Sequence, residues 1–160
     1  MVRVLFVCLG NICRSPTADG IFRKMVADAG LVGEIESDSA GTSDYHAGDP
    51  PDPRATAAAR KRGIDLSPMR ARMLEPEDLE NFDIVLTMDK MVHRSVASLQ
   101  RAHRKSKADV RLFLEHAPHL GVSEVPDPYL GGADGFEHVL DLVEEASEGL
   151  LEHIKKNHLR

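Results

Sequence analysis

The sequence has only two cysteines, Cys8 and Cys13, and no long hydrophobic run. Two cysteines separated by four residues cannot build the disulfide framework of a small secreted domain. The N-terminus lacks the basic and apolar segments of a signal peptide, and the apolar runs are too short to span a bilayer. We therefore expect a cytoplasmic protein without a membrane partner.

A basic surface and a metal-binding motif are also missing. Lys and Arg number 20 against 26 Asp and Glu, which gives a net charge of −6. This balance argues against a nucleic-acid partner, because nucleic-acid binding draws much of its affinity from basic surfaces. The eight histidines show neither H-E-x-x-H nor the paired Cys/His spacing of a zinc site, so we expect no metal. The Gly-rich motifs of nucleotide-binding loops are absent as well.

The order of the predicted elements indicates a single α/β domain over residues 1–160. The predicted strands and helices alternate along the chain. Strands are expected at 2–7, 34–39, 83–88 and 110–114. Helices are expected at 16–29, 54–62 and 75–80. A fourth helix should begin after Asp89, which would cap it, and the last helix should begin at about residue 136. This order is typical of a doubly wound, Rossmann-like sheet of four parallel strands with helices on both faces, which binds ligands at the carboxyl ends of its strands.

The segment C-L-G-N-I-C-R-S, residues 8–15, lies directly between the first predicted strand and the first predicted helix. A tight strand–loop–helix turn points backbone N–H groups into the loop, and the helix N-terminus adds positive potential there. The same donors would stabilise the thiolate of Cys8, the form that acts as a nucleophile. Arg14 can return over the loop and hold two oxygens of a tetrahedral anion. The C-x5-R spacing therefore predicts an oxyanion site.

The other residues of this loop suit the same purpose. Gly10 permits a left-handed or closely approaching backbone, and Asn11 tolerates the left-handed region better than other non-glycine residues. Ser15 has two compatible roles, as a helix cap and as a hydroxyl that stabilises the Cys8 thiolate. The alternative interpretation of Cys8 is a small buried hydrophobe at a strand end. The remaining residues expected around the anion are Leu9, Ile12 and Cys13.

The run V-C-L-G-N-I-C-R-S-P, with D-S-A-G-T-S at 38–43 and P-D-P-Y at 126–129, resembles the low-molecular-weight protein tyrosine phosphatases over nearly the whole chain. The resemblance implies hydrolysis of protein phosphotyrosine and aryl phosphates through a cysteinyl phosphate, with inorganic phosphate as product and no cofactor. It makes Cys8 the nucleophile, Arg14 the phosphate clamp and Asp127 the general acid and base. A positioned carboxylic acid can protonate a leaving oxygen and later activate water. Without the resemblance, an aspartate before proline is an ordinary turn starter.

The resemblance also implies an aryl groove above the phosphate site. Its walls would be Leu9, Ile12, Tyr45 and Tyr129. A deep apolar slot favours phosphotyrosine, because phosphoserine and phosphothreonine are too short to place their phosphate at its floor. The alternative is that each tyrosine is simply a surface aromatic. Leu130 stands where the family often has a second aromatic residue, which would change contacts at the rim.

Ser39 resembles the family serine that supports the loop asparagine, here Asn11. The family usually adds a histidine from the segment that here spans 67–72, but this chain has Pro68 and Met69 there. We therefore expect Ser39 to hold Asn11 alone.

Asp89 lies in the family's M-D segment, where it would cap a helix or act electrostatically on Arg14. Cys13 would lie close to Cys8. Its thiol could trap an oxidised Cys8 as a disulfide and switch the enzyme off reversibly, which we treat as a hypothesis of redox regulation.

Two other functions compete with the phosphatase interpretation. An arsenate reductase shares the fold and the loop, but it needs further cysteines to relay a disulfide, and none follows Cys13. A non-catalytic anion-binding module would not need the acid Asp127.

Overall fold

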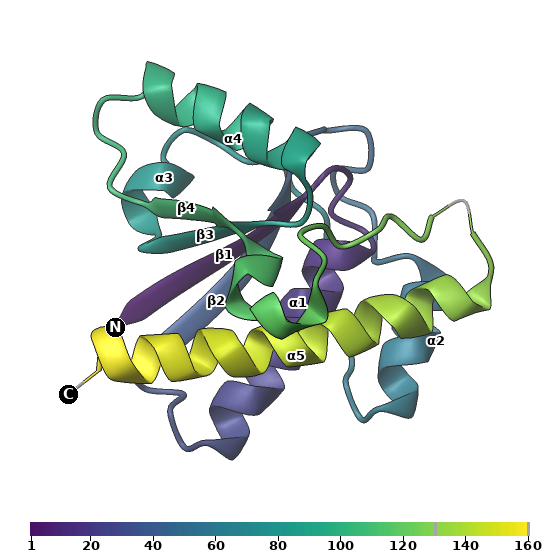
Figure 1. The fold of residues 1–160 in the computed structure, drawn as a ribbon. Helices are drawn as coiled ribbons and strands as arrows, with labels where there is room; N and C mark the ends of the chain where they lie inside the picture. Colours follow the sequence, from purple (N-terminus) through teal and green to yellow (C-terminus); the bar gives the residue numbers. More distant parts are fainter. Residues whose placement is uncertain (130, 160) are drawn as a thin grey trace.

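The computed structural model describes residues 1–129 and 131–159. Leu130, expected at the rim of the groove, lies outside these residues. Four strands form one parallel sheet in the order β2-β1-β3-β4 (Figure 1). The strands are β1 (Val2–Cys8), β2 (Ile35–Gly41), β3 (Ile84–Thr87) and β4 (Asp109–Leu112). The uninterrupted apolar run of β1 suits its central place, because a central parallel strand is covered on both faces.

Helices cover both faces of the sheet. On one face lie α1 (Arg14–Asp28), α2 (Pro53–Lys61) and α5 (Ala133–Asn157), and on the other lie α3 (Asp78–Asn81) and α4 (Lys90–Ala102) (Figure 1). Two short 3-10 helices, η1 (Phe113–His116) and η2 (Pro118–Leu120), follow β4. The predicted doubly wound α/β fold is confirmed. None of the helices in the described part of the chain is long and apolar enough to cross a membrane.

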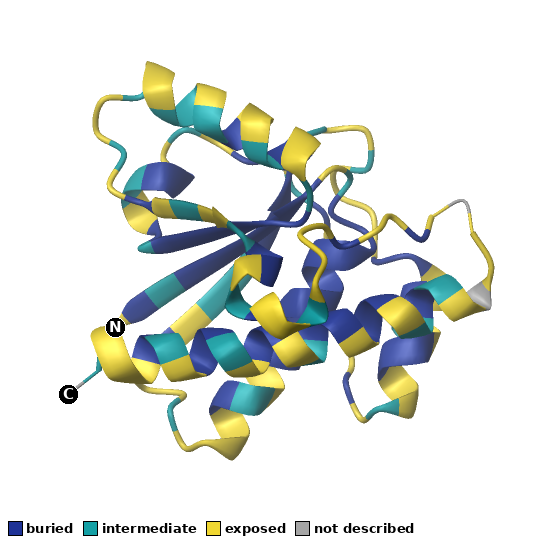
Figure 2. Cartoon of the chain, viewed as in Figure 1, coloured by how far each residue is buried: buried dark blue, intermediate teal, exposed yellow. Residues whose placement is uncertain are grey.

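Two hydrophobic clusters sandwich the sheet, and side chains of β1 alternate between them. Phe6 enters the larger cluster with α1 and α5, where its ring meets Phe22 and Phe113 edge-on at centroid distances of 5.7 and 5.2 Å. Leu5 and Val7 enter the smaller cluster beneath α4. Both layers are buried along the length of β1 (Figure 2), which fixes the strand end that carries Cys8.

Several element boundaries differ from the sequence-based expectation. The helix after the Cys8 loop begins at Arg14, and its N-cap position is Cys13 without a side-chain bond, so Ser15 does not cap it. The fourth strand ends at Leu112 because η1 follows it at once. The last helix begins at Ala133 rather than near Phe136. The prediction that Asp89 caps a helix is confirmed, since its Oδ1 accepts the Val92 N–H at 2.8 Å.

Candidate active site

The loop between β1 and α1 is held open by Asn11, which has a positive φ of 59°. Its Nδ2 donates to Ser15 Oγ at 2.8 Å and to Ser39 Oγ at 2.9 Å. Its Oδ1 accepts the backbone N–H of Arg72 at 2.9 Å. The predicted left-handed conformation of Asn11 is confirmed. The expectation that Ser39 holds Asn11 alone is wrong, because Ser15 and the main chain of Arg72 share that task.

The Arg72 segment reaches the loop because it lies beside the end of β2. Gly41 donates its N–H to the Arg72 carbonyl at 2.9 Å and accepts the Leu74 N–H at 2.7 Å. The Arg72 guanidinium forms ion pairs with Asp38 at 3.2 Å and Asp78 at 3.0 Å. A Cβ on Gly41 would lie 2.7 Å from the Leu9 carbonyl oxygen, so only glycine lets the loop approach β2 this closely.

Cys8 lies at the floor of the loop and is 2% exposed. The Asn11 backbone N–H donates to its Sγ at 3.3 Å, and Ser15 Oγ lies 3.0 Å from the same sulfur. Ser15 Oγ accepts a hydrogen bond from Asn11, so its own hydrogen can point either at Cys8 Sγ or at the Ala40 carbonyl, 3.4 Å away. The Asn11 N–H therefore stabilises a thiolate at this sulfur, and the Ser15 hydroxyl adds to this when its hydrogen points at Cys8. Of the two roles expected for Ser15, the contact with Cys8 is observed.

Arg14 is buried beside this sulfur, at 3% exposure. Its Nη1 donates to Asp89 Oδ2 at 2.7 Å and to the Val125 carbonyl at 3.0 Å. Burial favours the neutral form of Asp89, but the bonds from the Val92 N–H and Arg14 outweigh it, so the pKa of Asp89 lies below its ordinary value. Asp89 therefore caps α4 and also holds the Arg14 guanidinium.

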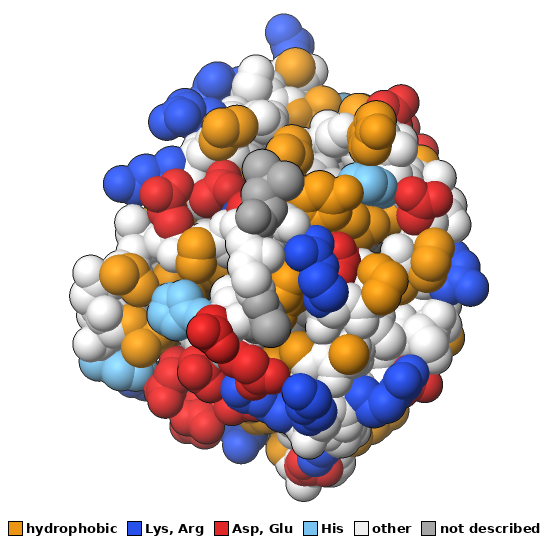
Figure 3. Space-filling model, turned by 90° about the vertical axis from the view of Figure 1, so that its right-hand side faces the viewer, with side chains coloured by type: hydrophobic (Ala, Val, Ile, Leu, Met, Phe, Trp, Pro, Cys, Tyr) orange, Lys and Arg blue, Asp and Glu red, His pale blue; other side chains and the backbone are white. Residues whose placement is uncertain are grey.

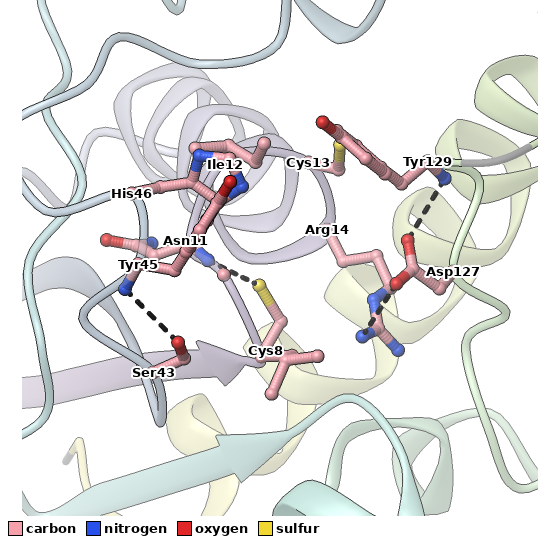
Figure 4. Close-up of a pocket in the computed structure, with 12 residues that line it drawn as sticks. Cys8, Asn11, Ile12, Cys13, Arg14, Ser43, Tyr45, His46, Asp127 and Tyr129 are labelled. Carbon is pink, nitrogen blue, oxygen red and sulfur yellow. Dashed lines mark hydrogen bonds and ion pairs between the residues drawn. The ribbon is translucent and has the colours of Figure 1, made fainter.

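Asp127 lies beside this guanidinium, in the segment that precedes α5 (Figure 4). Its Oδ2 is 3.8 Å from Arg14 Nη2, and its Oδ1 accepts the Tyr129 N–H at 3.0 Å. The second bond is that of a turn starter, so Asp127 forms a turn and also faces the site. Its side chain is 48% exposed, as access to a substrate requires.

These groups open into a cleft of ≈ 520 Å³. All four residues expected along the groove line it: Leu9, Ile12, Tyr45 and Tyr129. Hydrophobic side chains gather near the middle of the face onto which the cleft opens (Figure 3). The apolar and aromatic residues above Arg14 suit a flat aromatic ligand with an anionic end.

The model of the family described as low molecular weight phosphotyrosine protein phosphatase matches residues 3–160. The chain belongs to this family. It is 46% identical over 158 residues to a putative low molecular weight protein-tyrosine-phosphatase of Synechocystis sp., covering 97% of this chain and 98% of that protein. It is 40% identical over 136 residues to the human low molecular weight phosphotyrosine protein phosphatase, covering 85% of each.

Solved structures agree with this membership. The crystal structure of YfkJ from Bacillus subtilis superposes with a TM-score of 0.91 at 39% identity, covering 99% of this chain and 97% of that one. A protein tyrosine phosphatase from Entamoeba histolytica gives a TM-score of 0.89 at 32% identity, covering 98% of each chain.

Four groups that line the cleft or hold its residues were not predicted from the sequence. His46 lines the cleft and packs edge-on against Tyr45, with ring centroids 4.8 Å apart. Ser43 lines it as well and accepts the Tyr45 N–H at 3.2 Å. Both residues lie close to Tyr45 in residues 41–53, a long irregular stretch rich in Gly, Asp and Pro, and loops of this kind often carry function. The Val125 carbonyl and the Arg72 N–H belong to the main chain, so no residue type could reveal them.

The second cysteine of the loop, Cys13, is buried. Burial, followed by the nearby carboxylate of Asp52, raises the pKa of its thiol from 9.0 to about 12, so Cys13 is neutral where a Cys8 thiolate would react. Within residues 1–129 and 131–159, no group of three His, Cys, Asp or Glu side chains is placed to hold a metal ion.

Proposed function

We propose that this protein hydrolyses phosphotyrosine in proteins, and aryl phosphates, with release of inorganic phosphate. One observation carries the proposal: Cys8, Arg14 and Asp127 converge at the floor and edge of a single cleft whose upper walls are Tyr45 and Tyr129. A protein that only bound an anion would need the Arg14 clamp but not the acid Asp127. Relatives that are named protein-tyrosine-phosphatases support the same conclusion, because they align with this chain over nearly its whole length.

In the first step, the Cys8 thiolate attacks phosphorus in line with the bond to the leaving oxygen. The S–P bond forms as the P–O bond to the tyrosyl group breaks, and Asp127 gives its proton to the departing oxygen. Arg14 and the N–H groups of the loop hold the equatorial oxygens, where negative charge is spread in the transition state.

In the second step, water attacks the cysteinyl phosphate while Asp127 takes its proton. The P–S bond breaks, inorganic phosphate leaves and the thiolate returns. The Ser15 hydroxyl and the Asn11 N–H, which both lie against the sulfur, stabilise this thiolate as a leaving group. The cycle consumes one water and needs no metal or cofactor.

A catalytic thiolate must stay reduced, so we place the activity in the cytoplasm. Oxidation of Cys8 to a sulfenic acid by a peroxide, whose O–O bond is broken in the step, would allow Cys13 to condense with it, forming a disulfide and releasing water. The net charge of −6 disfavours nucleic acid and anionic membrane surfaces as partners.

The test is turnover of a phosphotyrosine peptide and its phosphoserine counterpart, with a chelator present. The parent chain should release phosphate from the first and far less from the second, because the shorter side chain leaves its phosphate above the floor of the cleft. Cys8→Ser should lose turnover, while Cys13→Ser, a cysteine variant of the same loop, should keep most of it. No turnover by the parent chain would refute the proposal.

A further inference from the structure

Arg54 stands in the first turn of α2, yet its side chain reaches the segment that carries Asp127. Its Nη2 donates to the Tyr129 carbonyl at 2.7 Å, and its Nη1 donates to the Gly131 carbonyl at 3.4 Å. The guanidinium also lies over the Tyr129 ring, 5.6 Å from its centroid, and over the Phe136 ring at 4.7 Å. One side chain therefore grips the backbone just beyond Asp127 and the first turns of α5.

The other side of the same guanidinium is fixed to the phosphate loop through Asp52. Arg54 Nε and Nη2 donate to the two Asp52 carboxylate oxygens at 3.1 and 3.0 Å. Burial favours the neutral form of Asp52, but the contacts with Arg54 outweigh it and lower the pKa of this carboxyl. The Asp52 backbone N–H donates to the Ile12 carbonyl at 2.8 Å. An unbroken series of hydrogen bonds thus joins the phosphate loop to Tyr129.

Both backbone polar groups of Tyr129, its N–H and its carbonyl, are hydrogen-bonded. Its N–H donates to Asp127 Oδ1 and its carbonyl accepts from Arg54. In the described part of the chain, the only ion pair of Asp127 is the one with Arg14, at 3.8 Å. A half-exposed carboxyl with so few partners depends on the backbone turn for its direction.

We infer that Arg54 is a positioning residue. It sets the Asp127 turn at a fixed distance from the phosphate loop, so that the acid points at the leaving oxygen. The inference rests on the proposed function. It concerns a residue that is not among those lining the cleft.

The effect of a misplaced acid depends on the leaving group. An ester of phenol needs protonation as it departs, whereas an ester of a much more acidic nitrophenol departs well without it. In Arg54→Ala, kcat/KM for phenyl phosphate should therefore fall about tenfold or more, and kcat/KM for dinitrophenyl phosphate should stay within about twofold. The slope of log kcat/KM against leaving-group pKa should steepen. Loss of stability alone would lower both rates equally.

Arg62→Ala is the matched control. Arg62 lies just after α2 and binds α5 through Glu137, Glu144 and Asp141, at 2.8 to 3.0 Å, without a contact to Tyr129 or Gly131. This variant should keep the leaving-group slope of the parent chain. Arg54→Lys keeps the charge but not the two-nitrogen grip on Asp52, so it should steepen the slope less than alanine does. It also serves if the alanine variant does not fold.

A double variant separates positioning from any direct role. With Asp127→Asn as the starting point, adding Arg54→Ala should not lower kcat/KM for phenyl phosphate further, because Arg54 acts through the acid. Equal losses for both esters, or independent losses in the double variant, would overturn the inference. If turnover by the parent chain depends on Asp127, and the Arg54 variants keep the parent's slope of log kcat/KM against leaving-group pKa, only this inference fails. If the parent chain hydrolyses no aryl phosphate, the proposed function fails and takes the inference with it.

Discussion

Asn11 shows what a single residue contributes to an anion site. Its backbone occupies the left-handed region at a φ of 59°, and three hydrogen bonds of its side chain hold it there. One of these bonds ends on Ser15, which in turn lies against the Cys8 sulfur. The conformation of the loop and the environment of the nucleophile are therefore set by the same side chain.

Substitution of Asn11 separates these two contributions. Asn11→Gly keeps the backbone freedom and loses the side-chain bonds, while Asn11→Ala loses both. We expect both variants to be less stable than the parent, with alanine lower than glycine by about 1–2 kcal/mol because of the left-handed backbone. Urea unfolding of the two variants measures this difference. Equal free energies of unfolding would contradict it.

At this scale, the sequence identifies side chains but not the main-chain groups that hold them. Cys8 and Arg14 are identified by residue type and spacing, and Asp127 by the resemblance of its P-D-P-Y segment to the family. The Arg72 N–H and the Val125 carbonyl are not, because their positions follow from how Gly41 pairs with the Arg72 segment and how the chain passes Met88. Such contacts depend on tertiary register, which residue types leave unspecified.

At the scale of elements, the predicted order of strands and helices is confirmed, and the errors lie at their ends. The sequence places a helix cap at Ser15, where serine is a common capping residue. In the structure its hydroxyl is engaged by Asn11 and Cys8, and the helix begins at Arg14, two residues before the predicted start. A tertiary contact has taken precedence over a local preference at the point where the site is built.

The start of α5 shows a related effect. The apolar stripe of the last helix begins at Phe136, which led to a predicted start there, but the helix extends back to Ala133. Arg54 covers the Phe136 ring and binds the Gly131 carbonyl just before the helix. Contacts from α2 therefore reach into a segment that shows no apolar periodicity of its own.

At the scale of the whole molecule, the strand order β2-β1-β3-β4 places β1 and its loop in the middle of the carboxyl edge of the sheet. The sequence predicts a doubly wound sheet but does not fix which strands are neighbours. This central place brings the loop after β1 within reach of the Arg72 segment, Asp89 and the Asp127 turn, which come from three distant parts of the chain.

Stability of the whole chain should depend on pH through His116, which lies in η1 against α5. Burial, and then the positive charge of His153, lowers the pKa of His116 from 6.5 to about 4. Below pH 6.5 the unfolded chain binds a proton that the folded chain rejects, so the free energy of unfolding should fall as the pH drops from 6.5 towards 4. We expect a loss of about 1–3 kcal/mol over this window from His116.

Urea unfolding at about pH 7 and about pH 5 measures this loss, and His116→Gln should reduce it. His119→Gln is the control, because His119 is exposed and pairs with Glu145 at the surface. The prediction fails if the free energy of unfolding falls by the same amount between the two pH values in His116→Gln and in the parent chain.

The central claim, that Cys8 forms a covalent bond to phosphorus at the floor of the cleft, is tested most directly by trapping that intermediate. The parent chain is mixed with excess aryl phosphate, quenched in acid within the first turnover, and analysed by peptide mass spectrometry. We expect one phosphoryl group per chain, on the peptide that contains residues 8–14 and on the sulfur of Cys8, and no such group in Cys8→Ser. Turnover without a phosphorylated Cys8, or an equal label in Cys8→Ser, would contradict the account.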